Sequence, residues 1–414
     1  MKKTLLFILV SSSLLTACGI FQKSQSRQDE TYNIPLRREQ PRERNVPARV
    51  SEVQQQNVLP PLTRRLDSLL ITADTLLQRT QLGLHVIDLT TGEELYARNP
   101  HHRMRPASTE KVVTAIAALD LLGPNYTLDT QLLTTAPVNK HTLNGDIYIK
   151  GVMDPLFRDA DIRSLVAQLK AAGITRINGH LVADASMKDA DEFGWGWCWD
   201  DDNPTLSPLL VGGKPGLAAQ LRAAMRKAGI TLGKGINKGT APASARCIAA
   251  IRRPLTEVLK PMLKESDNLC AEAVFYQMGK TRKDIAQRIS ELVGSGPSIA
   301  DGSGLSLYNY QTPATFTSLL AYATVNADSI FTPLMEALPI AAVDGTLKNR
   351  MADTPAAANV HAKTGSVTAV STLVGYLTQR STDHLIAFAI LNNGLPRMAE
   401  GRALQDKICI ILSE

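Results

Sequence analysis

The stretch Pro106-Ala107-Ser108-Thr109-Glu110-Lys111 opens the apolar run VVTAIAALDLL at residues 112–122. A hydroxyl residue commonly starts a helix, and the apolar residues after Ser108 recur at helical spacing, so we expect a helix with one buried face. Residues three apart on a helix share a face, which brings the Lys111 amine beside the Ser108 hydroxyl. Desolvation lowers the pKa of a lysine, and a neutral amine accepts a serine proton. The pattern indicates a nucleophile and its base.

Two further motifs strengthen this reading, because S-x-x-K alone is expected about once or twice by chance in a chain of this length. Ser266-Asp267-Asn268 lies in the helix-like stretch 254–279, and Lys363-Thr364-Gly365 opens the strand-like stretch 361–378. The patterns S-x-x-K, S-x-N and K-T-G each occur once, in this order. Penicillin-binding proteins and class A β-lactamases carry the same ordered set.

The composition fits a globular protein without a cofactor. With 414 residues the chain has room for two globular units and an N-terminal extension. Its net charge of +6 is spread over scattered Lys and Arg residues, so we expect no nucleic-acid partner. We find no C-x-x-C, H-E-x-x-H, P-loop or G-x-G-x-x-G motif and therefore expect no metal and no cofactor.

The N-terminal residues indicate export. Residues 1–17, MKKTLLFILVSSSLLTA, have the basic start, short apolar core and small-residue end of a signal peptide. Leu15-Thr16-Ala17-Cys18 resembles the bacterial lipobox, which implies a diacylated Cys18 and, since Gly19 follows, an outer-membrane address facing the periplasm. The alternative is an ordinary signal peptide with an incidental cysteine. Residues 18–60 are polar, and we interpret them as a flexible, lipid-anchored tether.

Beyond the tether, the pattern predicts an α+β fold. An amphipathic helix over 62–77 precedes a hairpin around Thr91-Gly92, and strands over 361–378 and 384–393 precede a final helix over 398–413. We expect an antiparallel sheet flanked by helices, formed by residues 61–126 and 251–414. Residues 127–250 are rich in strand and turn signals and are predicted to be one inserted β-rich domain. The tryptophans at 195, 197 and 199 suit either a small core or a substrate platform.

From residue 62 to the C-terminus the sequence resembles the class C low-molecular-mass penicillin-binding proteins, which are D-alanyl-D-alanine carboxypeptidase/endopeptidases. The segments PAS-TEK, GDIYIKG-x-x-DP, LVADAS, SDNLCAE, DGSGLS and AKTGS look like those of that family, in its order. The resemblance implies a serine β-lactamase/transpeptidase-like domain that trims peptidoglycan stem peptides through an acyl-enzyme and is inhibited by penicillin. The stretch between Ser108 and Ser266 looks shorter than in larger members, so we expect a single inserted domain.

The resemblance also implies roles for individual residues. Ser108 would attack the carbonyl between two D-alanines while Lys111 takes its proton. Ser266 would relay a proton to the leaving D-alanine, and Asn268 would bind the donor amide.

The remaining implied roles concern substrate binding. Lys363 would offer a cation to the terminal carboxylate, with the Thr364 hydroxyl beside it. Gly365 would let the strand approach the substrate, and the N–H groups of Ser108 and Ser366 would form an oxyanion hole. Asp184 would bind a free amine of the stem peptide; the alternative is a turn residue at the end of a strand.

Three other functions share some of these features. A β-lactamase has the same motifs, but no E-x-x-L-N stretch is present. An esterase or D-aminopeptidase on the same scaffold is a second alternative, and the G-x-S-x-G elbow of other serine esterases is absent. A lipoprotein that binds cell-wall peptide without hydrolysing it is the third.

Overall fold

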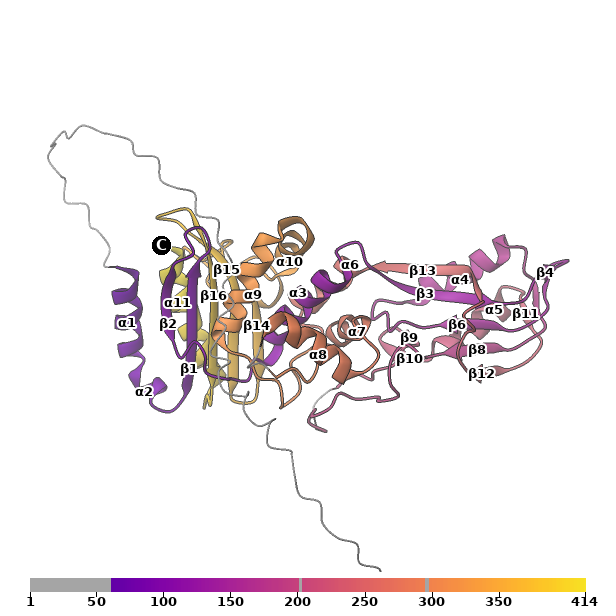
Figure 1. The fold of residues 1–414 in the computed structure, drawn as a ribbon, viewed down its shortest axis with the longest axis horizontal. Helices are drawn as coiled ribbons and strands as arrows, with labels where there is room; N and C mark the ends of the chain where they lie inside the picture. The colour runs from indigo at the N-terminus through magenta and orange to yellow at the C-terminus, as the bar shows by residue number, and fades with distance from the viewer. Residues whose placement is uncertain (1–60, 201–202, 295–297) are drawn as a thin grey trace, which may run out of the picture. The chain divides into compact units, whose positions relative to one another are not determined.

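The computed structural model describes residues 61–200, 203–294 and 298–414, so the predicted signal peptide, the tether and Cys18 lie outside the described residues. A five-stranded antiparallel sheet has the order β14-β15-β16-β1-β2 (Figure 1). Its strands are β1 (Gln81–Asp88), β2 (Glu94–Arg98), β14 (His361–Val367), β15 (Val370–Gln379) and β16 (His384–Asn393). The predicted N-terminal hairpin thus completes a sheet built mainly by the C-terminal part of the chain.

Helices cover both faces of this sheet, because β15 and β16 are buried over most of their length and need apolar partners on each side. On one face lie α1 (Leu62–Thr72) and α11 (Met398–Ser413), with α2 (Asp74–Leu77) following α1. The other face carries helices whose apolar side chains share a second core with the sheet: α3 (Glu110–Leu122), α6 (Leu255–Lys264), α7 (Asn268–Gln277), α8 (Arg282–Val293), α9 (Pro313–Val325) and α10 (Thr332–Ala337). The predicted α+β class is confirmed.

The predicted helix over 254–279 is interrupted at the second motif. Helix α6 ends at Lys264 and α7 begins at Asn268. Pro261 cannot donate a helical hydrogen bond inside α6, and the Asp267 side chain caps α7 by accepting a hydrogen bond from the Cys270 N–H at 2.8 Å. Ser266 lies between the two helices with a φ of 62°. The sharp turn therefore presents the Ser266 side chain outside any helix.

Residues between α3 and α6 form a separate mixed sheet with the order β12-β8-β6-β3-β13. Its strands are β3 (Thr127–Thr134), β6 (Ile147–Lys150), β8 (Leu181–Asp184), β12 (Ile236–Lys238) and β13 (Arg246–Pro254). The pairs β6–β8 and β8–β12 are parallel, whereas β3 pairs antiparallel with both β6 and β13. A sheet independent of the first one explains the change of sequence pattern in this region, although the exact domain limits stay a prediction.

Parallel strands need long connections, and two helices that we did not predict supply them. Helix α4 (Asp159–Ala171) joins β6 to β8, and α5 (Leu217–Lys227) lies between β8 and β12. Both bury one apolar side in a third core. The expected strands are present, but the region also contains two helices. Their apolar spacing was not recognised among the neighbouring strand and turn patterns. Short strands complete it: β4 (Val138–Asn139), β5 (Thr142–Leu143), β7 (Arg176–Ile177), β9 (Leu210–Val211), β10 (Lys214–Pro215) and β11 (Thr231–Leu232).

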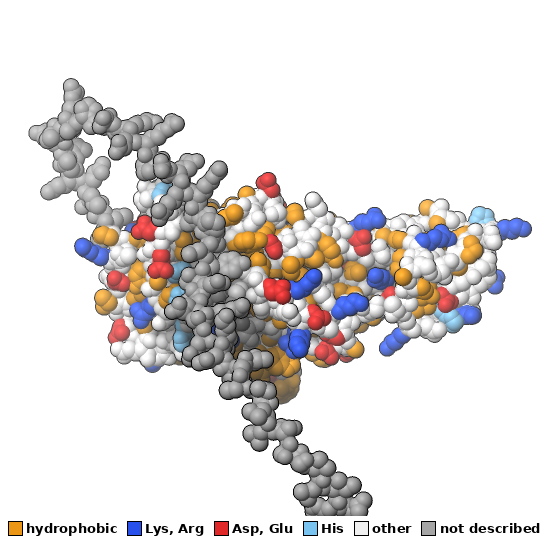
Figure 2. Space-filling view, viewed as in Figure 1, with side chains coloured by type: hydrophobic (Ala, Val, Ile, Leu, Met, Phe, Trp, Pro, Cys, Tyr) orange, Lys and Arg blue, Asp and Glu red, His pale blue; other side chains and the backbone are white. Residues whose placement is uncertain are grey.

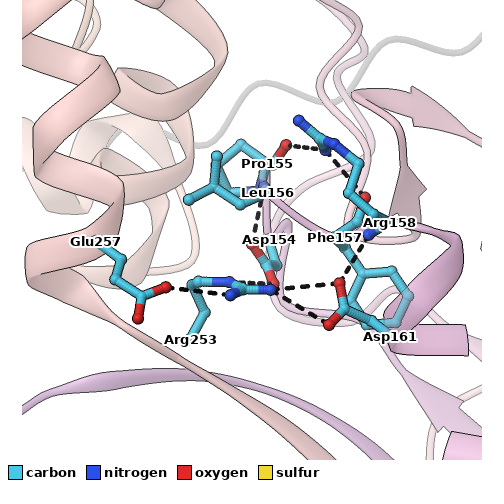
Figure 3. A network of polar contacts seen from close by, with 8 residues as sticks. All are labelled: Asp154, Pro155, Leu156, Phe157, Arg158, Asp161, Arg253 and Glu257. Atoms are coloured by element: carbon cyan, nitrogen blue, oxygen red, sulfur yellow. Dashed lines mark hydrogen bonds and ion pairs between the residues drawn. The ribbon is translucent and has the colours of Figure 1, made fainter. Parts of the chain in front are cut away.

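An arginine joins the mixed sheet to the neighbouring helices (Figure 3). Arg253, near the end of β13, forms ion pairs with Asp154 at 3.4 Å, with Asp161 in the first turn of α4 at 3.3 Å, and with Glu257 in α6 at 3.1 Å. The Asp154 side chain is 1% exposed and that of Arg253 is 19% exposed. The chain therefore passes from the mixed sheet into α6 at a largely buried ionic contact.

Positive and negative side chains are mixed on the face drawn in Figure 2. Figure 2 shows Lys and Arg side chains interspersed with Asp and Glu over the visible face, without a continuous basic band. Among the helices of the described ranges, none combines the length and the apolar character that a membrane-spanning helix needs.

Candidate active site

Ser108 lies in a short 3-10 turn, Ala107–Thr109, that leads into α3. This differs from the predicted helix start, because the Ser108 hydroxyl makes no capping hydrogen bond. The Pro106 carbonyl oxygen accepts hydrogen bonds from the hydroxyls of Thr109 at 2.6 Å and Thr372 at 2.7 Å. Since Thr372 belongs to β15, these bonds fix the turn against the sheet and leave the half-buried Ser108 hydroxyl available.

The Lys111 amine is completely buried next to this hydroxyl. Its Nζ lies 2.9 Å from Ser108 Oγ, 2.8 Å from Asn268 Oδ1 and 2.7 Å from the Ser303 carbonyl oxygen. Burial lowers the pKa of Lys111 to about 8, although nearby acidic groups, Asp301 first, act in the opposite direction. A neutral amine has two N–H bonds and one lone pair. In the charged form Nζ donates to all three oxygens. Once the amine loses a proton, the two carbonyl-type oxygens accept its remaining N–H bonds, and its lone pair is left for the Ser108 hydroxyl.

Two buried glutamates lie near Lys111. Glu272 accepts hydrogen bonds from the N–H groups of Gly302 and Ser303 at 3.1 and 2.9 Å, and burial raises its pKa to about 8. Burial also raises the pKa of Glu110 well above its usual range, and Gln311 donates to both of its oxygens at 3.0 Å. Both carboxyls therefore favour the neutral form, and Asp301 rather than either of them is the strongest influence that raises the pKa of Lys111.

A second buried lysine, Lys363 in β14, supports the second motif. Its Nζ donates to Ser266 Oγ at 2.9 Å and to the Thr364 carbonyl oxygen at 2.7 Å. Burial, and then the nearby Lys111, lower the pKa of Lys363 well below its usual range. The amine lies behind Ser266 and is fully buried. Its predicted contact with a substrate carboxylate stays a prediction, and the geometry favours a hydrogen bond that positions Ser266.

A cavity of about 690 Å³ opens in front of these groups. It is lined on the side of the motifs by Ser108, Ser266, Thr364, Gly365, Ser366, Ser371 and Thr372, and on the other side by Thr346, Asn349, Arg350, Ala399, Arg402, Ala403 and Asp406. Asp406 accepts two hydrogen bonds from Arg350, at 2.9 and 2.6 Å. The exposed Arg402 guanidinium has no hydrogen bond or ion pair with the described residues, so it is the cation available to an anionic ligand here.

Gly365 permits β14 to approach the nucleophile. A Cβ atom at this position would lie 2.7 Å from the Pro106 carbonyl oxygen and 3.0 Å from the Thr109 nitrogen. We predicted that the glycine makes room for a substrate; the structure adds that it makes room for the turn carrying Ser108. A larger side chain at position 365 would push β14 away from this turn and so disturb the position of Ser108.

Asp184 is not brought together with the other predicted site residues. It ends β8, is 1% exposed, and accepts hydrogen bonds from the N–H groups of Ser186 at 3.0 Å and Ala241 at 2.8 Å. It does not line the cavity that contains Ser108. These contacts are those of a turn residue at a strand end, and its role in binding a stem-peptide amine stays a prediction.

The loop 301–309 places a group beside Lys111 that the motifs do not predict. Ser303 contributes a backbone carbonyl, which no side-chain pattern reveals, although the segments DGSGLS and SDNLCAE that contain Ser303 and Glu272 were both conspicuous.

Neither interpretation of the tryptophans holds for all of them. Trp197 packs partly buried against the core and donates a hydrogen bond to Asp301, whereas Trp195 and Trp199 are 52% and 94% exposed.

The arrangement suits covalent acyl transfer. The Ser108 and Ser266 side chains line one cavity, and a buried lysine amine lies 2.9 Å from the hydroxyl oxygen of each. Among the described residues, no group of three or more His, Cys, Asp or Glu side chains could hold a metal ion.

Similar proteins carry names that agree with this chemistry. D-alanyl-D-alanine carboxypeptidase DacB of Haemophilus influenzae is 28% identical over 70% of this chain and 81% of its own length. Carboxypeptidase DacB of Mycolicibacterium smegmatis is 30% identical over 81% of this chain and 82% of its own length.

The fold is also that of a solved penicillin-binding protein. The crystal structure of penicillin binding protein 4 (dacB) from Haemophilus influenzae superposes with a TM-score of 0.74 and 24% identity, covering 83% of this chain and 97% of that one. Its complex with a novel β-lactam has a TM-score of 0.67, 23% identity and the same coverage. The predicted transpeptidase-like fold is confirmed.

A family model extends this likeness over nearly all described residues. The model of the D-Ala-D-Ala carboxypeptidase 3 (S13) family matches residues 62–209 and 214–414. The predicted resemblance to D-alanyl-D-alanine carboxypeptidases is confirmed, and the chain belongs to the D-Ala-D-Ala carboxypeptidase 3 (S13) family.

Proposed function

We propose that this protein is a serine D-alanyl-D-alanine carboxypeptidase, with endopeptidase activity on cross-linked peptides, that trims peptidoglycan stem peptides through an acyl-enzyme. The observation that carries the proposal is the position of the Lys111 amine, which lies 2.9 Å from Ser108 Oγ while Asn268 Oδ1 and the Ser303 carbonyl oxygen hold it in place. The family and the names of its members identify the peptide bond between two D-alanines as the substrate.

Acylation begins when Ser108 attacks the carbonyl carbon of the penultimate D-alanine and Lys111 accepts the hydroxyl proton. The N–H groups of Ser108 and Ser366 stabilise the resulting oxyanion, a contribution of about 100- to 1,000-fold in rate for each donor. The C–N bond then breaks, and the proton that Lys111 accepted passes through the Ser266 hydroxyl to the leaving D-alanine, which restores the neutral Lys111 amine. Lys363 Nζ, 2.9 Å from Ser266 Oγ, positions this hydroxyl. Water hydrolyses the ester and regenerates the Ser108 hydroxyl.

Substrate binding uses the two walls of the cavity. Asn268 offers its N–H₂ group to the donor peptide, because its Oδ1 is occupied by Lys111. The hydroxyls of Thr364 and Ser366 line the floor, and the exposed Arg402 supplies the positive charge for the terminal carboxylate. Lys363, completely buried behind Ser266, remains the second candidate cation for this carboxylate.

Inhibition by penicillin follows from the same steps. The β-lactam carbonyl resembles the scissile one, and Ser108 opens the ring to give an ester. The leaving amine stays attached to the acyl group, so it remains in the cavity and hinders the approach of water. The Haemophilus influenzae relative has been crystallised with a β-lactam.

The proposed function is tested by release of D-alanine from a stem pentapeptide ending in D-Ala-D-Ala, with a cross-linked peptide dimer measured in parallel. We expect hydrolysis by the wild type and a loss of at least about 1,000-fold in Ser108→Ala. A peptide ending in L-Ala is the matched control and should stay intact. Equal activity of the wild type and Ser108→Ala would refute the proposal.

We further propose that the protein is a lipoprotein, made with a signal peptide and anchored through Cys18 to the outer membrane so that its catalytic part faces the periplasm. The support is the sequence MKKTLLFILVSSSLLTAC, and a diacylated cysteine provides two chains, enough for firm anchoring. Labelled fatty acid should enter the wild type but not Cys18→Ala, and the variant should fractionate with periplasmic proteins. A soluble wild-type protein that retains an unmodified Cys18 would contradict the anchor.

A further inference from the structure

The loop 301–309 is organised around the carboxylate of Asp301, which is 2% exposed. Its oxygens accept hydrogen bonds from the N–H groups of Gly304 and Ser306 at 2.8 and 2.7 Å and from the Asn309 side chain at 2.6 Å. These three donors belong to the loop itself. The fourth donor, the indole Nε1 of Trp197 at 2.8 Å, comes from the segment between β8 and β9.

Residues 195–197 of that segment pack closely against the loop. The N–H of Leu307 donates to the Gly196 carbonyl oxygen at 3.1 Å, and the Trp195 ring stacks on Tyr308 with 4.1 Å between centroids. Gly196 has a φ of 78°, and a Cβ atom there would lie 2.4 Å from the Tyr308 ring. Glycine therefore allows the backbone to lie against the loop and directs the Trp197 indole toward Asp301.

The same loop determines the direction of the Lys111 amine. The Ser303 carbonyl oxygen, two residues after Asp301, accepts a hydrogen bond from Lys111 Nζ at 2.7 Å. It is one of the two oxygens that occupy the N–H bonds of the neutral amine, so its position decides whether the lone pair faces Ser108. A displacement of this carbonyl by about 1 Å would misalign the base.

We propose that the Trp197–Asp301 hydrogen bond is a positioning element for Lys111, by which the segment between β8 and β9 controls the reactivity of Ser108. The inference rests on the proposed function, since it assumes that Lys111 is the base. Trp197 and Asp301 act through the loop and through charge, and neither needs to contact the substrate.

The electrostatic effect of the pair gives the proposal a signature. The groups that face Lys111 are Asp301 from the loop, Glu272, Cys270 and Asp267 from α7 and its cap, Glu110 from α3, and Lys363 from β14. Burial lowers the pKa of Lys111, and the Asp301 carboxylate is the strongest of the influences that raise it. The indole N–H partly neutralises that carboxylate, so its removal should raise the pKa of Lys111.

The experiment measures the rate of Ser108 acylation by benzylpenicillin as a function of pH in Trp197→Phe, which keeps an aromatic ring and removes the N–H donor. We expect acylation about tenfold slower near neutral pH, and a rate that begins to fall at a pH higher by about half a unit. Trp195→Phe is the matched control, because it keeps the stack on Tyr308 and does not touch Asp301; its rates should equal those of the wild type. Circular dichroism verifies that each variant is folded.

A second variant tests the charge itself. Asp301→Asn removes the carboxylate, so the pH at which acylation falls should move lower, opposite to the shift in Trp197→Phe. Unchanged rates and pH dependence in Trp197→Phe would overturn the proposal. A slower rate with an unshifted pH dependence would also overturn it, because it would indicate only that the loop 301–309 is held less firmly. If Trp197→Phe does not fold, an unshifted Asp301→Asn overturns it. Failure of the wild type to acylate would instead refute the proposed function.

Discussion

Replacing Arg253 by leucine should destabilise the junction between the mixed sheet and the helices by about 3 kcal/mol. The Asp154 side chain is 1% exposed, so without its partner at 3.4 Å the buried carboxylate keeps, among the described residues, only the hydrogen bond from the Leu156 N–H at 2.9 Å. Removing one member of a buried ion pair typically costs 3–5 kcal/mol, roughly, and the long contacts to Asp154 and Asp161 place this case at the lower end. The pair with Glu257, whose side chain is 52% exposed, adds at most about 0.5 kcal/mol.

A double-mutant cycle in urea measures this. Circular dichroism follows the unfolding, because the tryptophans contact the loop 301–309 or the solvent and do not report on the mixed sheet. Asp154→Asn combined with Arg253→Leu removes the uncompensated charge, and the double variant should recover about 2 kcal/mol of the loss. Glu257→Gln is the exposed control and should change stability by less than about 0.5 kcal/mol. Additive effects of the two substitutions, or a loss below about 1 kcal/mol in Arg253→Leu, would refute the reasoning.

Three further predictions concern the active site. The pKa of Lys111 is lowered to about 8, and only the neutral amine accepts a proton. The rate of acylation by penicillin, measured by stopped flow, should therefore rise about tenfold per pH unit below pH 8 and level off above it. A pH-independent rate would contradict this. Arg402→Ala should raise KM by about tenfold for a peptide ending in a carboxylate and leave its C-terminal amide analogue unaffected; equal effects on both would exclude a charge contact. Gly365→Ala places a Cβ 2.7 Å from the Pro106 carbonyl oxygen and should slow acylation about 100-fold, and near-normal rates would show that the turn adapts freely.

The motifs were readable from the sequence because they are made of side chains at fixed spacing. Ser108 and Lys111 are three residues apart on one helical turn, so their proximity follows from helix geometry, and it holds even though the turn around Ser108 is a 3-10 turn. The sheet was readable because alternation and apolar runs over 361–393 are the pattern of buried antiparallel strands.

Other features depend on contacts that no local pattern encodes. The Ser303 carbonyl at Lys111 is a backbone group brought in over 192 residues, and the Trp197–Asp301 bond joins residues 104 positions apart. The burial of Lys363 depends on the packing of β14 against the helices, which no local pattern encodes, and its contact with the terminal carboxylate stays a prediction. Arg402 lies on α11, which lines the cavity only in the folded protein, so the sequence alone does not identify it as a residue that binds the substrate carboxylate.

The central claim is that Ser108, activated by Lys111, forms a covalent ester with acyl donors. The most direct test is the intact mass of the protein after incubation with benzylpenicillin, for the wild type and Ser108→Ala. Because opening of the β-lactam ring releases no fragment, the account predicts one lasting adduct with the full mass of the drug in the wild type and none in Ser108→Ala. No adduct on the wild type, or an adduct that persists in Ser108→Ala, would contradict it.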